Sequence, residues 1–216
     1  MTANIKAAIE GLYEAFSDVP KPLHIGYCPH CYDDDPYPQL LAKPLKSITG
    51  EDIYSYVYSV FSTAGDTADF LYYFPRMCEL GVYEDIEIEL VLKKAALDSG
   101  WQNWKLHHKN AFLKFADSFF DAIPEVQIEG GLIDDWICGL SFMIDDISSK
   151  LDIFLVESEI SKVNLVSFYE MNSGPLIKKR LSNAFWEKDY PNYKRIVEWF
   201  YSPEVVSKLN QVYNLL

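Results

Sequence analysis

The stretch that decides the fold reads AGDTADFLYYFPRMCEL, residues 64–80. Between Phe70 and Leu80, large apolar side chains fall on every side of the helix that they would form. A helix that is apolar all round has protein on all sides. We therefore expect this segment to be the central helix of an all-α fold. Pro75 should kink or split it, because proline lacks the N–H that an interior helical position donates.

On both sides of this stretch, apolar residues recur at the spacing of helices, and prolines, glycines and capping residues mark their ends. The short connections favour antiparallel neighbours, as an irregular multi-helix bundle or as α-solenoid-like stacked helix pairs. About ten helices are expected, over residues 5–16, 52–61, 67–80, 84–99, 103–123, 133–144, 147–156, 158–170, 176–188, 192–201 and 203–215.

The domain organisation follows from chain length and composition. In 216 residues, 49% of them apolar, the chain can bury a full core without a metal ion or disulfides. We expect residues 1–216 to form a single helical domain, and Gly130 with Gly131 to mark a subdomain break if there is one.

The formal net charge of −13 bears on the partner. A field of this sign repels phosphate backbones and anionic lipid surfaces, which argues against nucleic acid and membranes, and it attracts a basic protein. No apolar run approaches the roughly 18 residues of a membrane span. The amphipathic first helix is unlike a signal peptide, so we expect a cytoplasmic protein.

Two runs of acidic residues are the predicted partner-binding surface. One lies in the proline-rich segment 19–38 and the other at the start of the helix expected over 84–99. They comprise Asp33, Asp34 and Asp35 in the first run, and Glu84, Asp85, Glu87 and Glu89 in the second.

The sharpest chemical motif is Cys-Pro-His-Cys, residues 28–31. A Cys-x-x-Cys turn directs two sulfurs at one point, which suits zinc or a reversible disulfide. Zinc needs further ligands, and His24 is the best placed in sequence, with His30 and Cys78 as other candidates. The alternative is that Cys28 and Cys31 are small buried residues that anchor the loop.

The tetrapeptide resembles the active site of the periplasmic DsbA-type thiol oxidoreductases, and that resemblance implies thiol–disulfide exchange at Cys28 and Cys31. The chain departs from that family after Tyr32. The run 33–36 (Asp-Asp-Asp-Pro) ends the helix that the chemistry requires and sets negative charge beside the sulfurs, which raises a thiol pKa.

Other motifs indicate no catalytic residues. The chain has no glycine-rich phosphate loop, no Gly-x-Ser-x-Gly and no His-Glu-x-x-His. His107 and His108 are adjacent, and neighbouring side chains on a helix point about 100° apart. We therefore expect them to be solvated or capping residues that do not bind one ion together.

A wider pattern joins the Cys-x-x-Cys to Asp69-Phe70, Phe74-Pro75-Arg76 and Glu79-Leu80. It resembles an uncharacterised family of bacterial all-helical proteins over the first half of the chain. In charge, size and class the chain also resembles the immunity proteins of bacterial toxin systems, which implies that it neutralises a basic toxin by covering it.

We therefore expect a non-enzymatic, acidic protein-binding protein that needs no cofactor. The alternative is a zinc-binding or thiol-based small enzyme or sensor that uses Cys28 and Cys31, with structural zinc as its metal.

Overall fold

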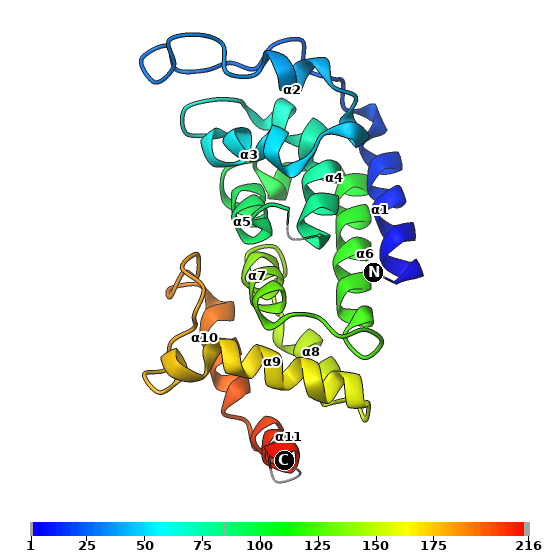
Figure 1. Ribbon diagram of the computed structural model, residues 1–216, viewed down its shortest axis with the longest axis vertical. Helices are drawn as coiled ribbons and strands as arrows, with labels where there is room; N and C mark the ends of the chain where they lie inside the picture. Colours follow the sequence, from blue (N-terminus) through cyan, green and yellow to red (C-terminus); the bar gives the residue numbers. More distant parts are fainter. Residues whose placement is uncertain (1, 84, 214–216) are drawn as a thin grey trace. The chain divides into compact units, whose positions relative to one another are not determined.

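The computed structural model describes residues 2–83 and 85–213. Within these ranges it contains eleven α-helices, is 65% helical, and has only isolated β-bridges in place of strands, so the predicted all-α class is confirmed (Figure 1). The chain forms two compact units. We call residues 6–115 the N-terminal unit, and residues 1–5 with 116–216 the C-terminal unit.

The boundary between the units at 115/116 differs from the break expected near Gly130 and Gly131, where a helix begins instead. The single domain over 1–216 stays a prediction.

The N-terminal unit is drawn in blue to green in Figure 1. Its helices are most of α1 (Ala3–Ala15), α2 (Pro38–Ala42), α3 (Gly50–Ser59), α4 (Thr67–Val82), α5 (Ile88–Leu97) and the first part of α6 (Leu106–Ala122). Three single 3₁₀ turns, η1 (Phe16–Asp18), η2 (Leu45–Ser47) and η3 (Trp101–Asn103), lie between them.

Helix α4 is the core of this unit, as its sequence predicts. Phe70, Tyr73, Phe74, Met77 and Cys78 are fully buried, and the helix contacts α5, η1 and η2. The ring of Phe74 lies against aromatic rings from three other segments, those of Phe16, Trp104 and Phe112. The first half of the chain therefore packs around the stretch 64–80.

Pro75 does not split α4, which runs on to Val82. The proline removes one backbone donor, but it is buried among neighbours whose packing holds the helical path. Asp66 caps the start of the helix by accepting hydrogen bonds from the N–H groups of Ala68 (2.8 Å) and Asp69 (3.1 Å).

Helix α3 is capped at both ends. Thr49 and Asp52 form a capping box at its start: the Asp52 N–H donates to Thr49 Oγ1 (3.3 Å), and the Thr49 N–H donates to Asp52 Oδ2 (2.8 Å). At the other end, the buried Lys94 ammonium donates to the carbonyls of Val57, Tyr58 and Val60 at 2.7, 2.8 and 2.9 Å. Those carbonyls would otherwise lack helical donors.

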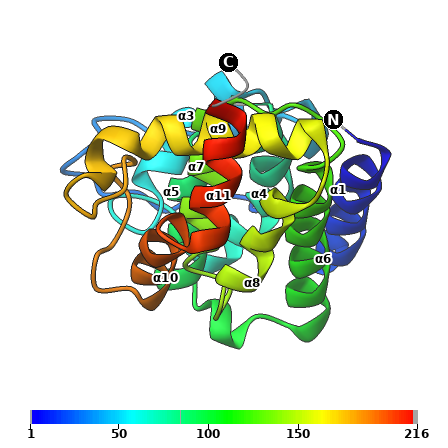
Figure 2. The same cartoon turned by 90° about the horizontal axis from the view of Figure 1, so that it is seen from below.

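The C-terminal unit contains the end of α6, α7 (Gly130–Leu140), α8 (Ser148–Leu151), the 3₁₀ turn η4 (Asp152–Leu155), α9 (Glu159–Leu176), α10 (Pro191–Phe200) and α11 (Pro203–Tyr213). Helix α9 contacts α7, η4 and α11, and Figure 2 shows α11 in red crossing α9 in yellow. Gly130 permits the close approach of α7 to α9, because a Cβ there would lie 2.3 Å from the Ser167 carbonyl oxygen.

Buried asparagines tie the irregular segments of this unit together. The Asn164 amide donates to the carbonyls of Ile123 (2.7 Å) and Val126 (2.8 Å), and its oxygen accepts from the Ile128 N–H (2.9 Å). The Asn192 amide likewise donates to the carbonyls of Ser141 (2.8 Å) and Ile144 (2.6 Å), and its oxygen accepts from the Ile147 N–H (3.3 Å). Each amide supplies partners that a loop lacks.

The helix predicted over 176–188 is wrong, because α9 ends at Leu176 and residues 177–190 form turns. Lys179 has a left-handed backbone conformation (φ 53°), which an α-helix does not accommodate. Side chains hold this segment instead: Asn172 Oδ1 accepts from the Ser182 N–H (2.8 Å) and the Tyr193 hydroxyl from the Leu181 N–H (3.3 Å).

Candidate functional site

The loop that carries the Cys-Pro-His-Cys motif is fixed against the α3–α4 connection of the N-terminal unit. The Cys28 N–H donates to the Thr63 carbonyl (2.8 Å), and the Gly65 N–H donates to the Gly26 carbonyl (2.7 Å). Tyr37 is buried, and its hydroxyl hydrogen bonds with that of Ser59. The loop therefore holds the motif in one place although it contains no long helix.

Within the motif, a tight turn brings the two thiols together. The N–H groups of Cys31 and Tyr32 both donate to the Cys28 carbonyl, at 3.0 and 3.3 Å. A hydrogen bond from the Cys31 thiol, with backbone N–H donors of the turn, lowers the pKa of Cys28, and the same contact raises the pKa of Cys31. This asymmetry is what a nucleophilic thiol with a second, resolving thiol requires.

The expectation that both cysteines are buried anchors is wrong, because Cys31 is exposed and Cys28 only half-buried. His24 is exposed too, and its ring lies against Tyr27, with 6.2 Å between ring centroids. The predicted zinc set of Cys28, Cys31 and His24 is not assembled: no metal-ligating group of three among the described residues includes them.

The first acidic run is at the surface. Asp33 and Asp34 are exposed, and neither forms an ion pair within the part of the chain that the structure describes. Asp35 is half-buried and accepts from the Tyr37 N–H at 2.9 Å, so it shapes the turn. Two of the three carboxylates thus remain available to a partner.

The second acidic run does not form one exposed patch. Asp85 is exposed, but Glu89 is buried, with 5% of its surface exposed, because it lies on an inward face of α5. Glu87 is half-buried. Glu84 lies outside the described residues. The expected surface at 84–89 is therefore corrected to Asp85 and, in part, Glu87.

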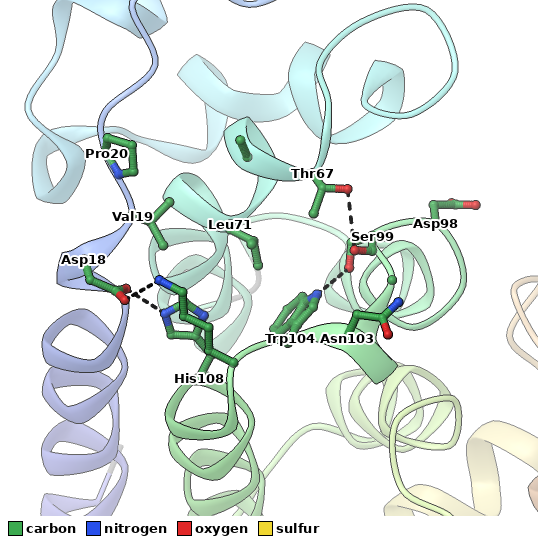
Figure 3. Close-up of a pocket in the computed structure, with 13 residues that line it drawn as sticks. Asp18, Val19, Pro20, Thr67, Leu71, Asp98, Ser99, Asn103, Trp104 and His108 are labelled. Atoms are coloured by element: carbon green, nitrogen blue, oxygen red, sulfur yellow. Dashed lines mark hydrogen bonds and ion pairs between the residues drawn. The ribbon is translucent and has the colours of Figure 1, made fainter.

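A second polar cluster brings together residues about ninety positions apart. Turn η1 presents Asp18 to the first turn of α6, where His108 Nε2 lies 2.8 Å from Asp18 Oδ1 and His107 Nε2 lies 3.3 Å from Oδ2 (Figure 3 shows the first of these contacts). The Lys105 ammonium lies 2.6 Å from Oδ2. Among the described residues, Asp18, His107 and His108 are the one set of three whose metal-ligating atoms lie within 4.8 Å of one another.

The two histidines of this cluster differ in environment. His108 is 1% exposed and stacks on the Phe16 ring at 4.1 Å between centroids, and its burial lowers its pKa. The His107 side chain is 53% exposed. Hydrogen bonds from Lys105 first, and His108 second, hold the pKa of Asp18 well below its usual range. At neutral pH the cluster is thus a carboxylate facing a neutral, buried imidazole.

A cavity of about 540 Å³ opens beside this cluster. Asp18, Lys105 and His108 line one part of it, and Leu71, Ser99 and Trp104 line another (Figure 3). The Trp104 ring nitrogen donates to the Ser99 hydroxyl at 3.0 Å, which fixes the indole that faces the cavity. The cavity therefore combines a charged edge with an apolar wall, as small-molecule sites do.

Comparison with known proteins does not assign this chain to a family. No family model matches the chain, and neither the curated proteins nor the solved structures contain a match. In the part of the chain that the structure describes, no helix combines the length and the apolar character of a membrane-spanning segment.

Sequence reasoning missed the Asp18 cluster. The expectation that His107 and His108 do not bind one ion together stays a prediction, but the Nε2 atoms of both residues reach the Asp18 carboxylate. The ring centroids of the two histidines are 4.3 Å apart at the start of α6, and both rings are directed at the Asp18 carboxylate. The pair of histidines was visible in sequence, but nothing there linked it to Asp18.

Proposed function

We propose that this chain is a non-enzymatic binding protein for a basic protein, with Asp33 and Asp34 at the centre of its contact surface. The observation that carries the proposal is the pair of exposed carboxylates, without cationic partners in the described residues, on a loop fixed at both ends. A fixed loop loses little conformational entropy on binding.

Charge and an exposed apolar side chain support this surface. The net charge of −13 attracts a basic partner at long range. Leu23, in the same loop, is 98% exposed and offers apolar area of the kind that interfaces bury. A basic protein that also has an apolar contact residue matches both features.

In its finer form, the proposal is that the chain is an immunity protein that neutralises a bacterial toxin by covering its basic surface. Acidic charge, small size and the all-α class support it. We include a cytoplasmic location and the absence of a nucleic-acid partner in this proposal, on the support of the same negative charge.

The test compares charge reversal at the loop with charge reversal elsewhere. The tagged full chain, its Asp33→Lys/Asp34→Lys variant and its Asp121→Lys/Glu125→Lys variant are used to capture proteins from the native host. Asp121 and Glu125 are also exposed, so both variants change the net charge equally. We expect a basic protein that the wild type and the control variant retain and the loop variant loses.

With that partner purified, the association rate constant of the loop variant should fall at least about 10-fold at low salt, because complementary charge mainly accelerates encounter. Equal capture by all three chains, or no stoichiometric basic protein with the wild type, would contradict the proposal.

A second candidate function rests on Cys28 and Cys31, which one backbone turn holds together and whose pKa values shift in opposite directions, as suits a thiol-based sensor. Its oxidant is a low-molecular-weight disulfide. The Cys28 thiolate attacks that disulfide, forms a mixed disulfide and expels one thiolate. Cys31 then loses its proton and attacks the Cys28 sulfur, expelling the second thiolate, so one disulfide is reduced as the Cys28–Cys31 disulfide forms.

Redox buffers of reduced and oxidised glutathione test this candidate. After acid quenching and alkylation, mass spectrometry should find a Cys28–Cys31 disulfide that rises with the oxidised fraction, while the buried Cys78 and Cys138 stay reduced. A protein in which these two thiols remain reduced in the most oxidising buffer would exclude this candidate.

A further inference from the structure

The distances around Asp18 fit a bound metal ion. Zinc bonds to histidine nitrogens and carboxylate oxygens are about 2.0–2.2 Å long, so tetrahedral ligand atoms lie about 3.3–3.6 Å apart. The carboxylate oxygens of Asp18 lie 2.8 and 3.3 Å from the Nε2 atoms of His108 and His107. One ligand atom from each of the three residues lies within 4.8 Å of the other two, so side-chain movements can place all three around one ion.

We propose that Asp18, His107 and His108 bind a divalent transition-metal ion of the Zn²⁺ or Co²⁺ type. Two imidazoles and one carboxylate are ligands that such ions prefer over Mg²⁺ or Ca²⁺, which take mainly oxygen ligands. This inference concerns a different part of the unit from the acidic loop and does not depend on a protein partner.

Electrostatics and access support the site. The carboxylate partly neutralises the ion, and the chain's charge of −13 attracts cations. His108 is buried and directs its Nε2 atom at the Asp18 carboxylate, 2.8 Å away, so this ligand atom is already held in place. Asp18 and His107 retain 41% and 53% side-chain exposure, which leaves an entry path from solvent.

Two competing groups set the expected affinity. The Lys105 ammonium, 2.6 Å from Asp18 Oδ2, must leave, and its 60% exposed side chain can move into solvent. Metal at His108 Nε2 places that ring's proton on Nδ1, which is buried and has no hydrogen-bond partner among the described residues. A buried donor without a partner loses its hydration and weakens metal binding. We therefore expect binding in the micromolar range rather than the picomolar range of closed structural zinc sites.

Three protein ligands leave at least one coordination position for water or another ligand. Asp18 and His108 line the cavity of about 540 Å³, so the ion would lie at its edge. A small molecule bound there could reach the ion with a donor atom while its apolar part contacts Leu71 and Trp104.

A Co²⁺ titration followed by visible absorption tests the site, because the d–d bands report the number and type of ligands. The titrated protein is the full chain with Cys28→Ser and Cys31→Ser, which removes the two thiols that are not buried. We expect one equivalent of Co²⁺ to bind with the spectrum of a nitrogen- and oxygen-ligated ion, and Zn²⁺ to displace it.

In that background, His107→Gln and Asp18→Asn should each weaken Co²⁺ binding at least about 10-fold, since loss of a group that only hydrogen bonds to a metal ligand already costs that much. Both side chains are partly exposed, so these variants should fold, which circular dichroism verifies. His24→Gln and His30→Gln, which change the other two histidines, should leave the affinity unchanged. Equal affinity in all four variants, or no bound Co²⁺ at micromolar protein, would overturn the proposal.

Discussion

In the C-terminal unit, Asn164 and Asn192 are buried and bond main-chain groups, whereas in the N-terminal unit Asp18 and His107 keep polar atoms in contact with solvent. The difference separates two uses of polar residues. A buried amide that completes the hydrogen bonds of a loop stabilises the fold. A polar group that is held by the fold but open to solvent can exchange its present partner for a ligand.

The N-terminal unit also contains a polar side chain, that of Lys94, which is buried and supports the fold as the two asparagines do. Lys94 is buried, and its ammonium is saturated by three carbonyls at the end of α3. Lys105, by contrast, is 60% exposed and has the Asp18 carboxylate as a partner. Burial and saturation, rather than residue type or unit, therefore decide which polar groups support the structure.

The largest effect is expected at Asn164. Replacing it with Leu, whose side chain has the same number and branching of heavy atoms, leaves two carbonyls and one N–H without these partners, and we expect a loss of about 3–4 kcal/mol in the free energy of unfolding. Urea unfolding followed by circular dichroism measures this. Asn110→Leu, at an exposed position of α6, is the control and should change stability little. Equal losses of stability in the two variants would show that the buried hydrogen bonds of Asn164 do not stabilise the fold.

The next effect is expected at Lys94. Lys94→Met keeps most of the unbranched side chain but removes the donor to three carbonyls, so the free energy of unfolding should fall by about 2–3 kcal/mol. Hydrogen exchange of α3 reports the change locally. Lys114→Met, at an exposed position of α6, serves as the matched control. If α3 exchanges at the wild-type rate in Lys94→Met, Lys94 is not the cap of this helix.

A pH dependence is expected at Asp134. Burial raises the pKa of this carboxyl to about 6, with a hydrogen bond from Asn172 opposing the shift. The folded state therefore binds this proton more tightly than the unfolded state, for which Asp has a pKa of about 4. The resulting stability is fully present below pH of about 4 and is lost as pH rises through about 6.

Asp134→Asn keeps an oxygen acceptor for Asn172 and removes the titration. We expect the variant to be more stable than wild type by about 1–3 kcal/mol at pH 7, and this difference to shrink toward pH 4. Urea unfolding of both chains across this range measures it. A difference that does not vary with pH would show that Asp134 does not titrate in this window.

The smallest effect is expected at the Cys-x-x-Cys turn. Cys28→Ser/Cys31→Ser should change the free energy of unfolding by less than about 0.5 kcal/mol under reducing conditions, because neither thiol is fully buried. Thermal unfolding checks this value. A large loss of stability would assign the pair to the structure and remove it from the candidate functional residues.

The sequence predicts the helices whose signals are local. The apolar residues of 70–80 identify α4 as a core helix, and Thr49 with Asp52 marks the start of α3. The helix predicted over 176–188 fails because Asn172 and Tyr193, outside that segment, hold its backbone in turns. Long-range side-chain bonds of this kind leave no periodic pattern in the segment that they fix.

The difference between local and long-range contacts also decides which candidate sites the sequence could predict. Cys28 and Cys31 are recognisable because both ends of the motif lie within four residues. Asp18 and His107 become neighbours only when η1 packs beside the start of α6, and Asp18 alone resembles any acidic residue at the end of a helix. Likewise, the inward position of Glu89 depends on where α5 begins, which is at Ile88 and not at residue 84.

The most direct test of the distinction between saturated and ligand-accessible polar groups is an NMR spectrum of the imidazole rings, recorded on the isotope-labelled Cys28→Ser/Cys31→Ser chain with and without Zn²⁺. The chain has four histidines. Our account predicts that equimolar Zn²⁺ shifts the ring nitrogens of His107 and His108 and leaves those of His24 and His30 unchanged. Unshifted His107 and His108 resonances, or equal shifts at all four rings, would contradict it.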